Sequence, residues 1–352
     1  MSHRGAGERR KGERVMKVVF VEKPHSLEIR EVAVPGPGKG EALVRVRAGG
    51  ICGSDMHIYH GTNPLAKYPR IIGHEFSGEI TAVGHGVTEF APGDRVAVDP
   101  VTSCGTCYPC SIGRPNVCER LEVFGVHRDG GFAEYIALPV KNLHRIPSDW
   151  SFEKGALVEP FTIAANVLSR TECSGSDRLL ILGAGPIGQV ILQAARRLGT
   201  ACAVADIVDV RLEKARSLGA ELTVNTREAS LEEKAAEWTG GAGVPLIIDA
   251  VGSPDLFPSL LRMASPAGRI GLLGFSKEPS SFVQLEAVKK ELSIFGSRLN
   301  RNKFPEVISW FSEGLVNPEL LVSHRFPFER VREAMRFIEE NPSEVCKVIL
   351  EF

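Results

Sequence analysis

The sequence lacks the features of membrane proteins and of nucleic-acid-binding proteins. No uninterrupted apolar run approaches the roughly 18 residues of a membrane span, and no charged-then-apolar signal peptide opens the chain. Lysine plus arginine (42) and aspartate plus glutamate (43) nearly cancel, leaving a net charge of -1. Internal repeats and low-complexity segments are also missing. These absences predict a cytoplasmic protein that partners neither nucleic acid nor membrane.

The composition is that of a globular protein with about two domains. Of the 352 residues, 43% are hydrophobic and 24% are charged. Residues 1–15 differ, because lysine and arginine outnumber acidic residues there and apolar periodicity is missing. We predict that residues 1–15 form a disordered leader and that Met16 is the true start. A functional basic arm is the alternative.

Apolar and polar residues alternate in the first part of the chain, which is typical of half-buried antiparallel strands. Turn clusters such as the Pro-Gly-Pro-Gly of residues 35–38 separate these runs. We expect a curled sheet or barrel, with strands over residues 17–21, 27–32, 42–48, 76–83 and 94–98.

From about Glu159 the pattern becomes a series of strands and helices. Strands are predicted over residues 178–182, 203–205, 246–251, 269–273 and 292–295, with an amphipathic helix that follows the first of them and ends at Gly199. Such a βαβ series packs as a right-handed parallel sheet with helices on both faces. The tail adds helices near 303–312 and 328–340 and a closing strand at 347–351, which needs a sheet to join. We therefore predict an α/β fold with a β-rich domain (16–158 and 297–352) and a doubly wound parallel domain (159–296).

A glycine fingerprint follows the first strand of the second domain. In residues 183–188, Gly183 allows a tight turn, Gly185 lets the backbone approach a pyrophosphate, and Gly188 lets helix and strand pack closely. Pro186 and Ile187 open the helix, whose N-terminus offers N–H groups to phosphates. A plain glycine turn at a strand-helix corner is the alternative.

The coenzyme preference follows from an acid at the end of the next strand. Asp206 suits the adenosine ribose hydroxyls and repels a 2′-phosphate, which favours NAD over NADP. Arg211 lies nearby and could receive such a phosphate, but we expect the charge of Asp206 to prevail.

Four of the eight cysteines crowd into one loop that is rich in glycine and proline. In a reducing compartment this spacing favours metal over disulfides, so we predict a closed structural zinc site at Cys104, Cys107, Cys110 and Cys118. Reduced cysteines or a redox pair are the alternative. The isolated Cys173, Cys202 and Cys346 are expected to be packing residues.

A second group of metal-binding residue types comprises Cys52, His74 and Glu75, with glycines beside them that allow sharp turns. No fixed spacing rule joins Cys52 to His74. A histidine with a purely structural role is therefore an open alternative.

Together these motifs resemble the zinc-dependent medium-chain dehydrogenases, in the branch with sorbitol and threonine dehydrogenases. The resemblance covers residues 16–352 and is strongest in residues 50–75, 99–118, 127–135, 159–166 and 291–310. Within that branch it is nearest to starvation-sensing proteins that look like L-galactonate and L-gulonate 5-dehydrogenases. The family implies a GroES-like β-rich catalytic domain, a Rossmann domain, two zinc ions and NAD.

The resemblance also implies a catalytic zinc held by Cys52, His74 and Glu159, with Glu75 beside it or as an alternative ligand. Glu159 stands where the alcohol-dehydrogenase branch has a cysteine; a carboxylate binds zinc more weakly, so water or a polyol hydroxyl can share the coordination sphere. Asp55 matches the carboxylate that orients the ligand histidine. For Asp55, Glu75 and Glu159, turn or surface roles are the alternative.

The implied chemistry is hydride transfer from a zinc-polarised alcohol to the nicotinamide. Ser54 matches the proton-relay hydroxyl, and His57 the link to solvent, unless His57 is a sheet-edge residue without a catalytic task. Thr162 lies in a matching stretch and is predicted to contact the coenzyme.

Substrate recognition is predicted from a segment that resembles the place of the polyol dehydrogenases' substrate arginine. It contains Arg298 and Asn300, and weaker candidates are Lys67, Arg70, His127 and Arg128. We expect oxidation of a sugar acid, of the L-gulonate or L-galactonate type, at C5 by a homodimer or homotetramer that pairs near residues 271–293. A polyol or threonine dehydrogenase, a non-catalytic signalling protein and a zinc-free reductase are the alternatives.

Overall fold

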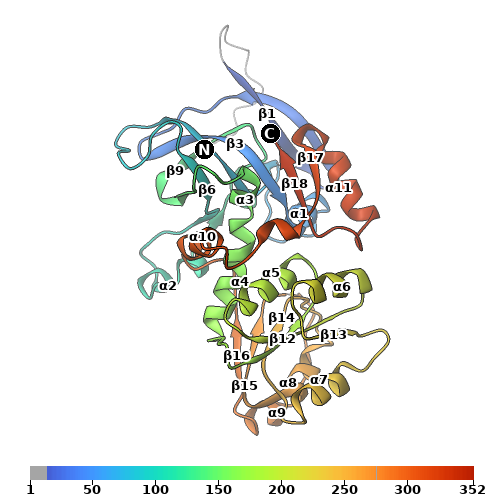
Figure 1. Ribbon diagram of the computed structural model, residues 1–352. Coiled ribbons are helices and arrows are strands. Elements are labelled where there is room, and N and C mark those ends of the chain that lie inside the picture. Colours follow the sequence, from blue (N-terminus) through green and yellow to red (C-terminus); the bar gives the residue numbers. More distant parts are fainter. Residues whose placement is uncertain (1–13, 275) are drawn as a thin grey trace.

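The computed structural model describes residues 14–274 and 276–352, which form a β-rich lobe and an α/β lobe (Figure 1). The strands of the β-rich lobe are β1 (Val15–Lys23), β2 (Ser26–Ala33), β3 (Glu41–Ile51), β4 (Arg70–Ile71), β5 (Glu75–Val83), β6 (Arg95–Val98), β7 (Val101–Thr102), β8 (Glu122–Val123), β9 (Tyr135–Pro139), β10 (Leu143–Arg145), β17 (Val322–Pro327) and β18 (Lys347–Glu351). Its helices are α1 (Gly53–Tyr59), α2 (Tyr108–Ser111), α3 (Phe152–Ala156), α10 (Phe304–Ser312) and α11 (Val331–Glu340), with single 3-10 turns η1 (Pro115–Val117), η2 (Val140–Asn142), η3 (Pro318–Leu321) and η4 (Phe328–Arg330).

The main sheet of the β-rich lobe is completed by the end of the chain. Its order is β10-β6-β5-β3-β18-β17, with β9 also paired to β3. Strand β18 runs antiparallel to β3, with Val348 opposite Ile51 and Leu350 opposite Gly49. The closing strand thus lies beside the strand that leads into Cys52, as the red and blue ribbons of Figure 1 show.

The α/β lobe contains a six-stranded parallel sheet in the order β13-β12-β11-β14-β15-β16. Its elements are α4 (Val158–Arg170), β11 (Arg178–Leu182), α5 (Pro186–Arg196), β12 (Ala201–Asp206), α6 (Asp209–Ser217), β13 (Leu222–Asn225), α7 (Leu231–Thr239), β14 (Val244–Asp249), α8 (Phe257–Met263), β15 (Ala264–Leu272), α9 (Gln284–Val288) and β16 (Ser293–Gly296). The strand order reverses between β11 and β14, and α/β sheets bind ligands at such a point. The predicted α/β class, with a β-rich domain and a Rossmann sheet, is confirmed.

Helix α4 joins the two lobes, and its interior residues are almost all buried. One apolar core contains Phe161 of this helix together with Ile181 of the parallel sheet and Ile349 of β18. Burial of each such side chain stabilises the fold by roughly 1.5–3 kcal/mol, so the lobes are held by a shared core. We propose domain boundaries at residues 158/159 and 296/297, close to the start of α4 and the end of β16.

Several predicted boundaries were wrong. Val15, assigned to a disordered leader, begins β1 and pairs with Ala33, while the carbonyl of Arg14 accepts a hydrogen bond from the Val34 N–H. The rest of that predicted leader, residues 1–13, lies outside the described residues. Strands β13 and β17 were not predicted, because both are short and half-exposed and so lack a clear alternation. No helix within residues 14–274 or 276–352 is long and apolar enough to cross a membrane.

Candidate active site

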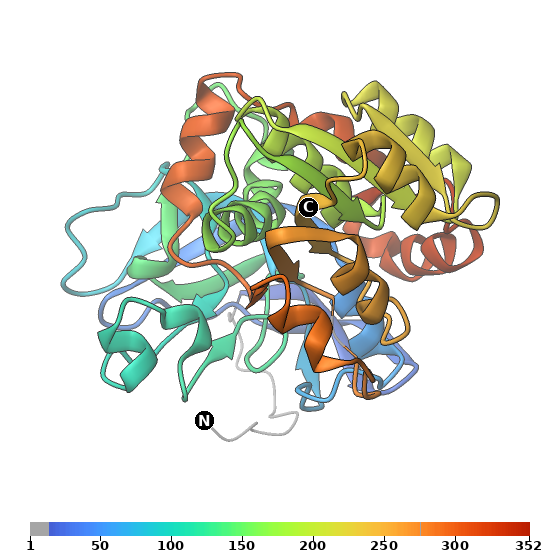
Figure 2. The same cartoon turned by 90° about the horizontal axis from the view of Figure 1, so that it is seen from below.

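A cleft of about 820 Å³ lies between the lobes. The β-rich lobe lines it with Cys52, Ser54 and His57, and the α/β lobe with the glycine fingerprint, including Gly183, Gly185, Pro186, Ile187 and Gly188. The cleft therefore brings the predicted phosphate-binding turn and the predicted metal ligands into one space. Figure 2 shows the lobes from a second direction.

Three predicted metal-binding residues converge beside this cleft. One ligand atom from each of Cys52, His74 and Glu75 lies within 4.8 Å of the other two. Cys52 is the N-cap of α1, and Glu75 begins β5 just after a glycine turn. Gly73 has φ +93°, and a Cβ on it would lie 2.2 Å from the Phe132 ring, so the sharp turn before His74 requires glycine.

Asp55 holds the two ligand segments together. Its fully buried carboxylate accepts hydrogen bonds from the Cys52 N–H (2.9 Å) and the Gly73 N–H (3.2 Å). It also lies 3.6 Å from Nδ1 of His74, too far for a direct hydrogen bond but close enough to orient the ring. Burial opposes protonation of His74, but Asp55 and Cys52 together outweigh it and raise the His74 pKa well above its usual value. The position suits the predicted orienting role.

Glu159 lies in the first turn of α4, outside the group of three that lies within 4.8 Å. Its side chain is buried and, among the described residues, has no hydrogen bond or ion pair. Burial raises the pKa of Glu159 to about 8, with repulsion from Glu75 adding to the rise and attraction to His74 opposing it. A buried carboxylate without a partner favours a cation nearby. Thiolate, imidazole and carboxylate are also the ligand set that zinc prefers, so these residues fit the metal.

Glu75 has a partner that sequence reasoning missed. Nζ of Lys347 lies 2.8 Å and 2.6 Å from the two carboxylate oxygens, and both side chains are almost fully buried. Lys347 is the first residue of β18, so the end of the chain contributes a charge beside the predicted zinc. The sequence shows a lysine at the start of an otherwise apolar closing strand, which indicates a special role for that lysine. The sequence does not show that its partner is Glu75.

Ser54 and His57 lie on one short helix, α1, and both line the cleft. The Ser54 hydroxyl is 3.3 Å from Nε2 of His74. Nδ1 of His57 is 2.8 Å from the Thr62 hydroxyl, a hydrogen bond that orients the ring. Both predicted relay residues thus line the cleft, and Ser54 lies within reach of a predicted metal ligand.

The coenzyme side of the cleft follows the glycine fingerprint. A Cβ on Gly188 would lie 1.8 Å from the Gly183 carbonyl oxygen, whereas a Cβ on Gly185 would meet no protein atom within 4 Å. Gly188 therefore serves packing, and Gly185 leaves open space at the helix N-terminus. Asp206 accepts hydrogen bonds from the Ala184 N–H (2.6 Å) and the Ile207 N–H (2.7 Å). Arg211 also lines the cleft and donates to the Pro342 carbonyl of the other lobe (2.5 Å).

Two predicted contact residues point elsewhere. Thr162 is fully buried, and its hydroxyl donates to the Glu159 carbonyl (2.5 Å) within α4, so it does not line the cleft. Asn300 is also buried and donates to Asp99 (3.1 Å). Contact of Thr162 with the coenzyme and of Asn300 with the substrate stays a prediction, since neither side chain lines the cleft in this structure. Their polar groups satisfy buried partners, which sequence spacing cannot show.

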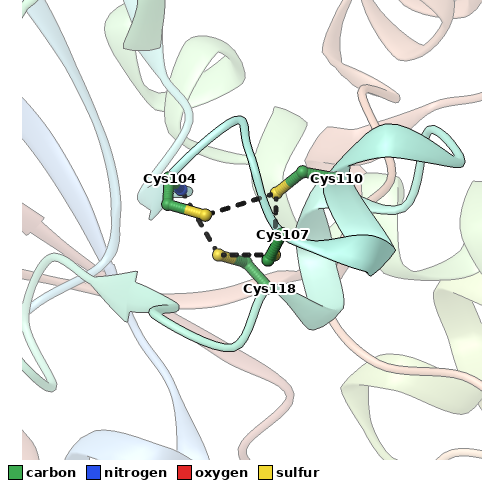
Figure 3. Close-up of side chains that lie close together, drawn as sticks. All are labelled: Cys104, Cys107, Cys110 and Cys118. Atoms are coloured by element: carbon green, nitrogen blue, oxygen red, sulfur yellow. Dashed lines mark hydrogen bonds between the residues drawn. The ribbon is translucent and has the colours of Figure 1, made fainter.

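The four-cysteine loop forms a compact cluster of thiols (Figure 3). Neighbouring sulfurs are 3.4 Å (Cys107 to Cys110), 3.6 Å (Cys107 to Cys118) and 4.0 Å (Cys104 to Cys110) apart. A zinc tetrahedron with bonds of about 2.3 Å has sulfur–sulfur edges of about 3.8 Å, so the spacing fits the ion. The Thr106 N–H and hydroxyl lower the Cys104 pKa to about 4, which favours the thiolate that zinc needs.

Comparison with known proteins agrees with this geometry. The family profile described as alcohol dehydrogenase GroES-like domain matches residues 38–148, and that described as zinc-binding dehydrogenase matches residues 186–313. The chain is 50% identical to the starvation-sensing protein RspB of Escherichia coli K12 over 339 residues, which cover 96% of this chain and 99% of that protein. It is 33% identical to L-galactonate-5-dehydrogenase of the same organism over 342 residues, which cover 96% and 99%.

A crystal structure of the E. coli CFT073 RspB protein, a dehydrogenase complexed with NADH, superimposes with a TM-score of 0.93. The match covers 96% of this chain and 99% of that chain at 50% identity. Both family profiles, the high coverage and the paired metal-ligand clusters lead to one conclusion. The chain belongs to the zinc-dependent medium-chain alcohol and polyol dehydrogenases, enzymes that use zinc and a nicotinamide coenzyme.

Proposed function

We propose that this enzyme oxidises the C5 alcohol of a sugar acid of the L-gulonate or L-galactonate type to the keto acid, with NAD as oxidant. One observation carries the reaction class: the group of Cys52, His74 and Glu75 adjoins the cleft that the glycine fingerprint lines. The sugar-acid assignment is supported by the 33% identity to a dehydrogenase of L-galactonate. We further propose a place in sugar-acid catabolism in the cytoplasm.

The roles of the residues follow from their positions. The family resemblance assigns Cys52, His74 and Glu159 to the catalytic zinc. Glu75, neutralised by Lys347, is the glutamate that lies within 4.8 Å of Cys52 and His74, and it would be the alternative ligand. A zinc ion held by these residues would supply Lewis acidity toward the substrate hydroxyl, and NAD bound at the glycine fingerprint would supply the hydride acceptor. Ser54 takes the hydroxyl proton, and His57, oriented by Thr62, passes it to solvent.

Coenzyme binding divides between two ends of the cleft. The open space at Gly185 and the N-terminus of α5 suit the pyrophosphate. Asp206 would accept the ribose hydroxyls and repel a 2′-phosphate, so NAD is the proposed coenzyme. Arg211, which faces the same cleft, would lie beside the ribose.

We also propose a homodimer or homotetramer that pairs along β16 and the preceding segment. Strand β16 is the last in the parallel sheet, so one side of its backbone has no partner strand among the described residues. Beside it, Val283, Leu285 and Val288 expose 65%, 62% and 74% of their surface. Light scattering of the wild type and of the Leu285→Glu/Val288→Glu variant tests this. A monomeric wild type would refute it.

The function is tested by NADH formation with L-gulonate, L-galactonate, D-sorbitol, xylitol and L-threonine. Cys52→Ala should abolish turnover and release one of two zinc equivalents, whereas the matched control Cys173→Ala should retain both. Turnover on sorbitol or threonine alone would support the polyol or threonine alternative. Silence on every compound by zinc-loaded enzyme would favour a non-catalytic signalling role.

A further inference from the structure

A second hollow of about 620 Å³ adjoins the cleft. The two spaces share Pro64, Leu273 and Gly274 in their linings. Of the residues that the structure describes, no aspartate or glutamate lines the hollow, but four arginines do: Arg114, Arg170, Arg298 and Arg301. A wall with four positive charges and no negative one favours an anionic ligand.

The four arginines of the hollow differ in whether the described part of the chain already uses their guanidinium groups. Arg170 donates to the Gly296 carbonyl (2.9 Å), and Arg301 donates to the Gly113 carbonyl (2.6 Å). Arg114 and Arg298, by contrast, make no side-chain hydrogen bond or ion pair within residues 14–274 and 276–352. Arg114 comes from the four-cysteine loop and Arg298 from the turn after β16, so the hollow separates two available cations.

The turn that presents Arg298 is held firmly. Its carbonyl accepts a hydrogen bond from the Asn116 amide (2.7 Å), and the buried amide of Asn166 donates to the Ser297 hydroxyl and to the Leu299 carbonyl (both 3.0 Å). Leu299 has the left-handed φ of +51°. Because Asn116 lies within the four-cysteine loop, that loop positions Arg298 as well as supplying Arg114.

Three cationic side chains, Arg298 among them, act on His127, which lies outside the linings of both spaces. Burial lowers the pKa of His127, and Arg298 lowers it further. Arg70 and Lys67 act in the same direction, and only Glu122 opposes them.

We propose that this hollow binds the anionic end of the substrate, a carboxylate or a phosphate, through Arg114 and Arg298, and so selects charged polyols over neutral ones. The inference rests on the proposed dehydrogenase function and adds the site of discrimination. In a hexonate the carboxylate lies four carbon–carbon bonds from C5, roughly 5 Å along an extended chain. Guanidinium groups suit both anions, because their paired N–H donors match carboxylate and phosphate oxygens.

The test compares three substrates that share one carbon skeleton. L-gulonate is D-sorbitol with a carboxylate in place of the terminal alcohol farthest from the oxidised carbon, and D-sorbitol 6-phosphate carries a phosphate there. We expect kcat/KM of the wild type to be at least 100-fold higher for one of the two anions than for sorbitol. Preference for L-gulonate identifies a carboxylate as the natural group, and preference for the phosphate identifies a sugar phosphate.

The variants Arg298→Met and Arg114→Met should each lower kcat/KM for the preferred anion by a factor at least ten times larger than the factor for sorbitol. Arg227→Met, which removes an exposed arginine outside the hollow, is the matched control and should change neither value. Equal losses for anion and sorbitol would indicate a structural role and overturn the proposal. So would a wild type that prefers sorbitol or shows no preference, although the dehydrogenase function would then stand.

Titration calorimetry of the NADH complex with L-gulonate and D-sorbitol 6-phosphate tests the anion site separately from the proposed dehydrogenase reaction. If no compound is oxidised but an anion binds and Arg298→Met weakens it at least tenfold, the hollow is an anion site and the proposed reaction fails. If neither anion binds the wild type, the anion site is refuted whatever the turnover.

Discussion

The buried ion pair between Lys347 and Glu75 makes a strong prediction about stability. The pair joins the closing strand β18 to the start of β5, and the two side chains expose only 3% and 2% of their surface. Replacing Lys347 by Met leaves the Glu75 carboxylate buried without its cation. Removing one partner of a buried pair costs about 3–5 kcal/mol.

That cost converts to a change in melting temperature. An unfolding entropy of about 2.1 cal/mol/K per residue gives roughly 0.7 kcal/mol/K for the 352 residues of the chain. Lys347→Met should therefore lower Tm by about 4–7 °C in zinc-loaded protein, measured by differential scanning fluorimetry with metal content verified. The double variant Lys347→Met/Glu75→Gln leaves no unpaired charge, so its Tm should lie above that of Lys347→Met.

The control is an exposed pair of the same type. Lys234 and Glu237 are 2.8 Å apart but expose 43% and 67% of their side chains, and such pairs contribute little to stability because solvent screens their charges. Lys234→Met should therefore change Tm by less than about 1.5 °C. If Lys347→Met has no larger effect than Lys234→Met, or if the double variant is less stable than the single one, the reasoning about the buried pair fails.

Three further predictions follow from particular side chains. His144 is stacked on Phe304 at 4.8 Å, and burial lowers its pKa from 6.5 to about 4. Because the folded state resists protonation of His144, the contribution of this side chain to the free energy of unfolding is fully present above pH 6.5 and is lost as the pH falls toward 4. Urea unfolding at several pH values measures this loss of unfolding free energy. Between pH 6.5 and pH 4 the loss should be smaller in His144→Gln than in the wild type, by up to about 3 kcal/mol. Parallel plots of unfolding free energy against pH for the two proteins would contradict the assignment. Gly185→Ala should change Tm by less than about 2 °C but weaken NADH binding at least tenfold. Gly188→Ala should impair both folding and binding, because its Cβ would lie 1.8 Å from the Gly183 carbonyl oxygen. Equal behaviour of the two variants would refute the separate roles of these glycines. Cys107→Ser should remove one zinc equivalent and expose its loop to limited proteolysis while the second equivalent remains, and retention of both equivalents would rule out the structural site.

Sequence by itself determined the fold class and most of the residue types of the site. Alternation with a period of two marked the β-rich lobe, and the strand-helix series with its glycine fingerprint marked the parallel sheet. Both signals are local, because each depends on neighbouring residues within one element. The four cysteines lie within fifteen residues of one another in the chain, so their convergence was also predictable from spacing.

Tertiary structure decided every feature that depends on segments far apart in the chain. Lys347 meets Glu75 because β18 pairs with β3, and the four arginines of the second hollow come from three separate segments. Thr162 and Asn300 were assigned to ligands because of where they lie in sequence, yet their polar groups are used by buried partners. Residue type and local period fix which face of an element is polar. Which partner that face meets is set by the packing of the whole chain, because contacts between distant segments leave no periodic signal in a single sequence.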